Sequence, residues 1–195
     1  MTPSDETSTK HAIAAAALKV LREQGASGLS MRQVARCSGL VLSNVQYHYR
    51  NREQLLIGLT EVHISRCTEV MSSALGHAEE PTLREIIEAS LLDESVREVA
   101  QTFRELFALA LHQPAVQQRL DEYYHDTHAQ LAEFLVGYSG RPEPRCREAA
   151  AVLLATIEGA YLIGDAMSVG RAEMVDRVEA MTLALLQLAP GPRGT

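Results

Sequence analysis

The chain has 195 residues, of which 46% are hydrophobic and 22% are charged. This balance is typical of a globular protein that buries a core, and it excludes a disordered, collagen-like or disulfide-scaffold chain. No stretch approaches 18 consecutive apolar residues, and the polar start MTPSDETSTK lacks the apolar segment of a secretory signal. Three widely spaced cysteines fit a reducing compartment, so we expect a cytoplasmic protein with no membrane partner.

The net charge of −7 is unevenly distributed. Residues 10–52 contain seven Lys or Arg residues and one Glu, which gives this segment a net charge of +6 and leaves −13 on the remainder. A basic segment on an acidic body is typical of a protein that faces nucleic acid.

Helical periodicity along almost the whole chain, together with abundant Ala and Leu, predicts an all-α fold of about nine helices. The first apolar stripe stops at Gly25. Ser30 and Gln33 form a capping box that opens a short helix, and Gly39 follows the end of that helix. A second short helical segment covers residues 41–49.

Further capping signals predict the helices of the rest of the chain. Asn51 with Gln54 opens a long helix that ends near Gly76. Thr82, Asp93 and Pro114 mark the starts of the next three helices, and residues 140–144 form the clearest loop. The two last helices are expected at about 145–168 and 171–188, before a disordered tail at 190–195.

Two short helices separated by a tight glycine turn form a helix-turn-helix pattern at about residues 29–49. In this arrangement the second helix enters the DNA major groove, where Asn and Gln side chains can bond to adenine. Tyr, His and Arg side chains near the groove can donate to phosphate oxygens. The predicted DNA-binding residues are Ser30, Arg32, Gln33, Leu42, Ser43, Asn44, Gln46, Tyr47, His48 and Arg52.

These residues resemble the DNA-binding domain of the TetR-type transcriptional regulators. The resemblance covers about residues 9–57 and includes the L-S-x-R-x-V-A core from Leu29, the turn glycine, the Y-H-Y corner at 47–49 and the start R-E-x-L-L from Arg52. The chain departs from the family pattern at Val41, where Ser or Thr often caps the recognition helix, and at Gln46, where Tyr is common. A third departure is Arg52 in place of Lys. The uncapped start at Val41 favours a frayed or shifted helix.

The resemblance implies a three-helix DNA-binding domain at 5–57 and a helical effector-binding and dimerisation domain at 58–189. It implies a ligand-responsive regulator without enzyme activity or cofactor. We expect a repressor that binds a pseudo-palindromic double-stranded operator as a homodimer and is released by a small apolar or amphipathic effector.

Two alternatives come from other classes of protein. Glu122, His125 and His128 lie near one face of a helix, as in a helical metal-binding or enzymatic bundle, but the second copy of the motif that a di-iron site needs is missing. A solvated helix face is the better interpretation, so we expect no metal. The other alternative is a ligand-binding protein with a degenerate DNA domain, which only Val41 favours.

The acidic body holds the remaining candidate sites. Its aromatic residues can line an apolar pocket between helices, although each alone fits a core position. This candidate pocket comprises Phe103, Phe107, Tyr123, Tyr124, Phe134 and Tyr161. The last two helices are apolar over a wide arc and therefore favour a two-fold interface, for which we predict Ile157, Ala160, Val178, Met181 and Leu185.

Overall fold

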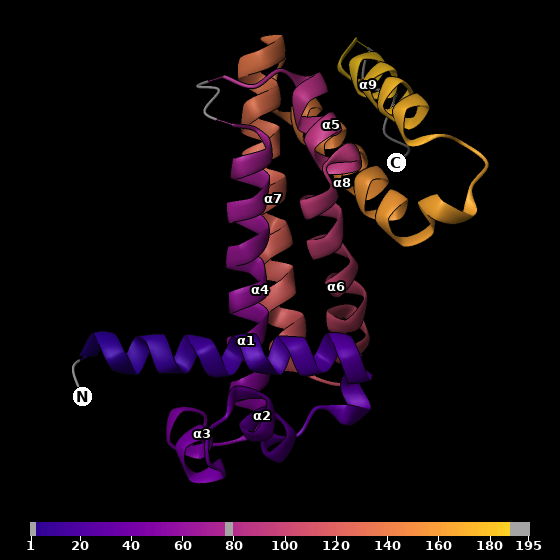
Figure 1. The fold of residues 1–195 in the computed structure, drawn as a ribbon. Helices are drawn as coiled ribbons and strands as arrows, with labels where there is room; N and C mark the ends of the chain where they lie inside the picture. The colour runs from indigo at the N-terminus through magenta and orange to yellow at the C-terminus, as the bar shows by residue number, and fades with distance from the viewer. Residues whose placement is uncertain (1–2, 77–79, 188–195) are drawn as a thin grey trace. The chain divides into compact units, whose positions relative to one another are not determined.

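The computed structural model describes residues 3–76 and 80–187. Within these ranges it contains nine α-helices, one short 3-10 helix and no strand, which confirms the predicted all-α fold (Figure 1). The helices are α1 Pro3–Gly28, α2 Met31–Ser38, α3 Leu42–His48, α4 Arg52–Ala74, α5 Leu83–Leu92, α6 Glu94–Ala110, α7 Pro114–Ser139, α8 Glu143–Ile163 and α9 Arg171–Gln187.

The helix ends follow the capping signals of the sequence. Gly25 breaks α1 with a φ of 67°, and Gly76, two residues beyond α4, has a φ of 66°. At Thr82 the side chain accepts from the backbone N–H of Glu85, while the Glu85 carboxylate accepts from the backbone N–H of Thr82 at 2.7 Å. Asp93 caps α6 through a 3.0 Å bond from the backbone N–H of Val96. Local sequence therefore determines most of the boundaries.

The last part of the chain differs from the expected bounds. Helix α8 begins at Glu143 instead of residue 145, because a proline is tolerated in the first turn of a helix, where no intrahelical donor is needed. It ends at Ile163 instead of residue 168, and the 3-10 helix Gly164–Ala166 follows. The predicted tail at 190–195 lies outside the described residues.

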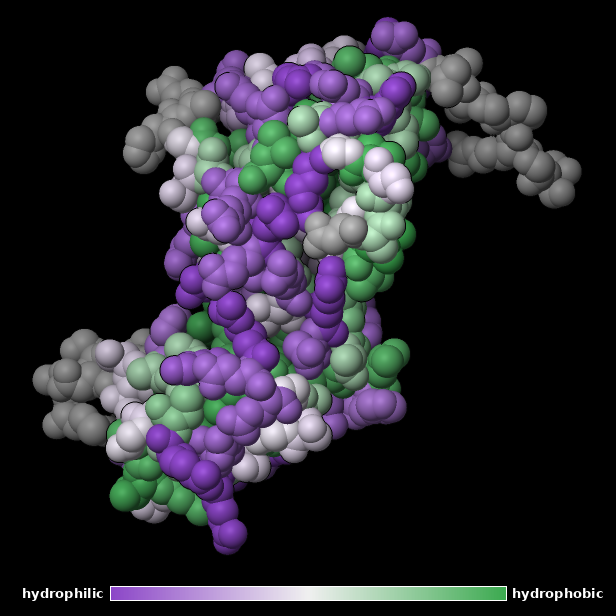
Figure 2. Space-filling model, turned by 45° about the vertical axis from the view of Figure 1, so that its right-hand side comes forward, coloured by the Kyte–Doolittle hydropathy of each residue, from purple (hydrophilic) through white to green (hydrophobic). Residues whose placement is uncertain are grey.

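The chain forms two compact units in space. The first unit comprises residues 1–68 and 101–122, and the second comprises residues 69–100 and 123–195. Helices α4, α6 and α7 therefore contribute residues to both units, and the predicted sequence boundary at residue 57 stays a prediction. None of the helices in the described ranges is long and apolar enough to span a lipid bilayer. Hydrophilic side chains cover much of the face in Figure 2, with hydrophobic patches between them.

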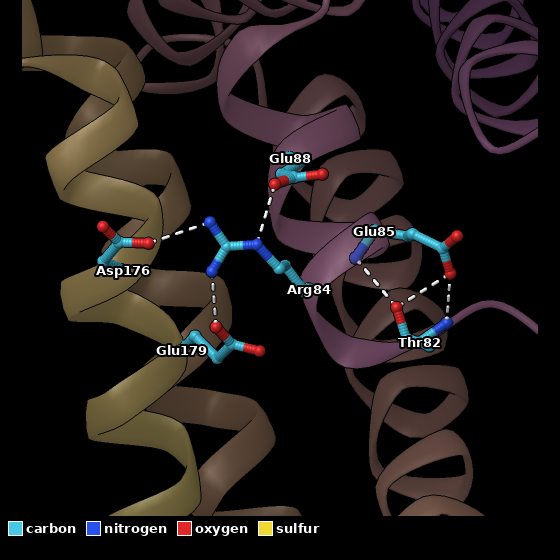
Figure 3. Close-up of polar contacts among 6 residues, drawn as sticks. All are labelled: Thr82, Arg84, Glu85, Glu88, Asp176 and Glu179. Atoms are coloured by element: carbon cyan, nitrogen blue, oxygen red, sulfur yellow. Dashed lines mark hydrogen bonds and ion pairs between the residues drawn. The ribbon is translucent and has the colours of Figure 1, made fainter.

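The second unit is built around the packing of α5, α8 and α9. Buried aliphatic side chains such as Leu83, Ile87 and Leu153 form its core. On the surface of this unit, the guanidinium of Arg84 on α5 bonds to Asp176 and Glu179 of α9, each at 2.8 Å, and to Glu88 of α5 at 2.9 Å (Figure 3). These ion pairs are exposed, so they fix the register of α5 on α9 more than they stabilise the unit.

In the first unit, α1 packs on α2 and α2 packs on α3. Tyr49, the residue that directly follows α3, is only 3% exposed. Its hydroxyl donates to the backbone oxygen of Lys10 in α1 at 3.1 Å. The ring lies so close to Gly58 of α4 that a Cβ atom added there would be 2.5 Å from a ring carbon. Tyr49 therefore connects the end of α3 to both α1 and α4.

This close packing predicts that Gly58→Ala lowers the free energy of unfolding by about 1–3 kcal/mol, because the ring or the helix must move to admit the added methyl group. Gly137→Ala in α7 is the matched control, since a Cβ atom there meets nothing within 4 Å. Alanine favours helix over glycine, so the control should gain up to about 1 kcal/mol. Urea unfolding followed by circular dichroism measures both values. Equal effects of the two substitutions would contradict the packing role of Gly58.

Candidate nucleic-acid interface

The two short helices α2 and α3 form the predicted helix-turn-helix. The Ser30 side chain accepts from the backbone N–H of Gln33 at 3.2 Å and caps the start of α2. Gly39 ends α2 with a φ of 71°, a left-handed conformation that glycine adopts without a steric penalty. Val34 on α2 and Val45 on α3 are both fully buried. The inner faces of both helices are therefore held in the core of the first unit, and their outer faces are available.

The outer face of α3 carries most of the predicted base-reading side chains. Ser43, Gln46 and Tyr47 are exposed, and the exposed fraction of Tyr47 is 64%. Leu42, Asn44 and His48 are partly buried. The rings of Tyr47 and His48 meet edge to face with 5.1 Å between their centroids. Polar groups that suit base edges and phosphates thus share one short helix.

The start of α3 is regular although its cap is missing. Val41 makes no side-chain capping bond, yet its backbone oxygen accepts from Asn44 at 3.0 Å and from Val45 at 3.3 Å. The helix thus begins at Leu42, so the expected shift of the helix start does not occur. In the sequence, Val41 stands out only as a missing cap, whereas the structure leaves its side chain 69% exposed.

Basic side chains accompany this face. Arg32, Arg36 and Arg50 are exposed, whereas Arg52 is half-buried and directs its Nε atom toward the backbone oxygen of Leu29 at 3.5 Å. At the start of α4, Asn51 accepts from the backbone N–H three residues later at 2.8 Å. Arg52 therefore links the start of α4 to the residue before the cap of α2, in addition to any contact with phosphate.

Tyr49 is a positioning residue that the sequence analysis did not single out beyond its place in the Y-H-Y corner. Burial raises the pKa of Tyr49 to about 12, and the charge of Glu61 contributes to the shift. The phenol therefore stays protonated and keeps its bond to the backbone of α1 at neutral pH. The sequence signal for this packing was Gly58, inside the long helix that begins at Arg52, because a glycine inside a helix lets another side chain approach the backbone closely.

The aromatic residues of the predicted pocket are divided between the two units. In the first unit, Phe103 is buried and Phe107 is 42% exposed, and their ring centroids are 6.2 Å apart. In the second unit, Tyr123 and Tyr124 lie edge to face at 5.1 Å. Tyr161 donates to the backbone oxygen of Ser90 at 2.8 Å, and Phe134 stacks on Tyr138 with 5.7 Å between centroids.

Glu158 of α8 is a half-buried polar residue in the second unit. Burial raises the pKa of Glu158 to about 7, and the nearby Tyr124 side chain acts in the opposite direction. The sequence did not single out Glu158, because a single Glu in a helical apolar stripe is common.

The predicted interface residues are largely buried within their own unit. Ile157, Ala160 and Val178 are no more than 7% exposed and belong to the core of the second unit, while Met181 and Leu185 are partly buried. The predicted set therefore overlaps the core of a single chain, and its role in an interface stays a prediction.

The candidate metal-binding set of α7 makes other contacts. Glu122 accepts hydrogen bonds from Gln118 and Arg119, and His128 contacts the backbone oxygen of Arg147 at 2.9 Å. Across the part of the chain that the structure describes, no three His, Cys, Asp or Glu side chains gather as metal ligands would.

Comparisons with known proteins agree with this geometry. Residues 79–187 match the family model of the BetI-type transcriptional repressor C-terminal domain. An uncharacterized HTH-type transcriptional regulator from the dhlA 5′ region of Xanthobacter autotrophicus is 29% identical over 178 residues, which cover 88% of this chain and 85% of that protein.

Two solved structures have a similar fold. A putative transcriptional regulator from Pseudomonas aeruginosa PAO1 has a TM-score of 0.78 at 19% identity, with 95% of this chain and 92% of that chain covered. The multidrug binding protein EbrR in complex with imidazole has a TM-score of 0.66 at 20% identity, with 95% and 98% covered. The family match spans more than half of the chain. Along the sequence it follows a helix-turn-helix with an exposed polar face. The chain therefore belongs to the TetR family of transcriptional regulators.

Proposed function

We propose that this regulator binds a pseudo-palindromic operator in double-stranded DNA as a cytoplasmic homodimer and represses transcription until a small effector releases it. The observation that carries the proposal is the outer face of α3, where Ser43, Gln46 and Tyr47 are exposed on a helix whose other side is buried. This face lies in the basic segment of a chain that is otherwise acidic. Side chains of these types bond to base edges and phosphates in the major groove.

The test of DNA binding is selection from random duplexes by the full chain, followed by gel shifts at several salt concentrations. Recovery of a two-fold repeated motif supports the proposal, because two copies related by a two-fold axis read inverted half-sites. A chain that enriches no sequence and binds only at low salt would contradict it.

A contact with a base and a contact with a phosphate predict different effects of substitution on DNA binding. Gln46→Ala should relax the preference at one base pair of each half-site and cost about 1–3 kcal/mol of binding free energy, because the amide can bond to both acceptor and donor of adenine. Arg32→Ala is the matched comparison on α2. It should weaken binding to all duplexes alike and flatten the salt dependence by about one unit of slope. Selection with Gln46→Ala that returns the unchanged motif would remove Gln46 from the readout.

The homodimer proposal is supported by an exposed apolar face on α8. Val152 and Leu162 are 39% and 60% exposed, and Ala155 and Gly159 lie on the same side of the helix at spacings of three and four residues. A Cβ atom added at Gly159 meets nothing within 4 Å of its own chain. An apolar face of this kind fits a second copy of the same helix, and small residues let the two helices approach closely.

Ala155→Arg should therefore convert the dimer to monomer and weaken operator binding, because a monomer contacts only one half-site. Ala155 is exposed in the single chain, so the substitution leaves the core intact, which one at the buried Ala160 would not. Ala108→Arg at an exposed position of α6 is the control for the added charge. Light scattering at micromolar concentration gives the molar mass, with circular dichroism to check folding. A wild-type monomer would overturn the homodimer, and a dimeric Ala155→Arg variant would move the interface elsewhere.

The effector proposal is supported by the aromatic side chains and by the half-buried Glu158 beside Tyr124. EbrR, which has a similar fold, was solved with imidazole and with malachite green, so these two compounds are suitable first probes. A compound that binds beside Tyr124 and Glu158 in the second unit should raise the melting temperature and release operator DNA. Tyr124→Ala should abolish this response while operator binding without the compound persists. An unchanged response of this variant would exclude Tyr124 from the effector site.

A further inference from the structure

An exposed apolar side chain stands beside the polar face of α3. Val41 is 69% exposed, whereas the valines within α2 and α3, Val34 and Val45, are fully buried. It directly precedes Leu42, and its backbone oxygen accepts the first hydrogen bonds of the helix. In a helix-turn-helix protein, the N-terminal residues of the second helix contact base edges. Val41 thus occupies a position where side chains meet bases.

A valine at position 41 does not stabilise the folded state. Ser30, Thr82 and Asp93 cap their helices in this chain with side-chain hydrogen bonds, whereas Val41 makes none. Valine is among the poor residues at this position of a helix, and here it also leaves an apolar side chain in water. Positions that break local rules without a structural gain are expected at functional sites.

The chemistry of valine restricts what it can recognise. Its side chain has no hydrogen-bond donor or acceptor, so it gains only from an apolar surface. In the major groove, thymine is the base that presents a methyl group, next to its O4 acceptor. We propose that Val41 is a specificity-determining residue that contacts the C5 methyl group of a thymine in each half-site. This inference rests on the proposed DNA binding and adds an apolar reader to the polar face of α3.

The test compares thymine with deoxyuracil, which differs only by the absent methyl group. In the motif selected by the wild-type chain, each thymine is replaced in turn, and affinities are measured by fluorescence anisotropy. One replacement per half-site should weaken wild-type binding by about fourfold, as for the loss of one buried methyl-sized group. Val41→Ser should bind the thymine and uracil duplexes equally, and Val41→Ala should discriminate between them less than the wild type does.

Two features keep the outcome interpretable. Val41→Ser adds a hydroxyl that can cap α3, so its melting temperature should equal or exceed that of the wild type. Arg32→Ala is the control that weakens binding while it keeps the full discrimination between thymine and uracil. Wild-type binding that is insensitive to every uracil replacement would overturn the inference, as would full discrimination by both Val41 variants. Absence of specific DNA binding altogether would instead overturn the proposed function and the inference together.

Discussion

The arrangement of the helix-turn-helix in the first unit depends on the packing of Tyr49 against Gly58. Helix α3 has only seven residues and no side-chain cap, so its own hydrogen bonds are too few to hold it in place. Tyr49 follows it directly, buries its ring on α4 and bonds to the backbone of Lys10 in α1. One side chain therefore fixes the end of α3 relative to two longer helices, which orients the exposed face for a rigid ligand such as a DNA groove.

Stability and recognition make opposing demands on α3. Val45 supports the core, whereas Ser43, Gln46 and Tyr47 stay in water and contribute little to folding. Val41 follows the same pattern, since its side chain neither caps α3 nor is buried. Because the neighbouring core holds α3 in place, the outer face of α3 can carry the polar side chains that the proposed reading of DNA requires.

The second unit packs three helices together while one apolar face of α8 remains exposed to solvent. Aliphatic side chains join α5, α8 and α9, and Arg84 bonds to two carboxylates of α9. The exposed apolar side chains of α8, including Val152 and Leu162, lie outside this core. Burial of such a face against a second copy would couple the assembly of the protein to the spacing of two DNA half-sites.

The sequence by itself determined the helices, the helix-turn-helix and the family resemblance, because capping boxes, glycine turns and helical periodicity act over a few residues. Its exceptions are also local, since Pro144 in the first turn of α8 moved a boundary by two residues. Only the tertiary structure placed Tyr49 on Gly58, brought Arg84 to Asp176 and Glu179, and separated the buried Ala160 from the exposed Ala155 on one helix. These facts depend on which helix faces pack together, and that is decided by the burial of apolar surface across residues far apart in the chain.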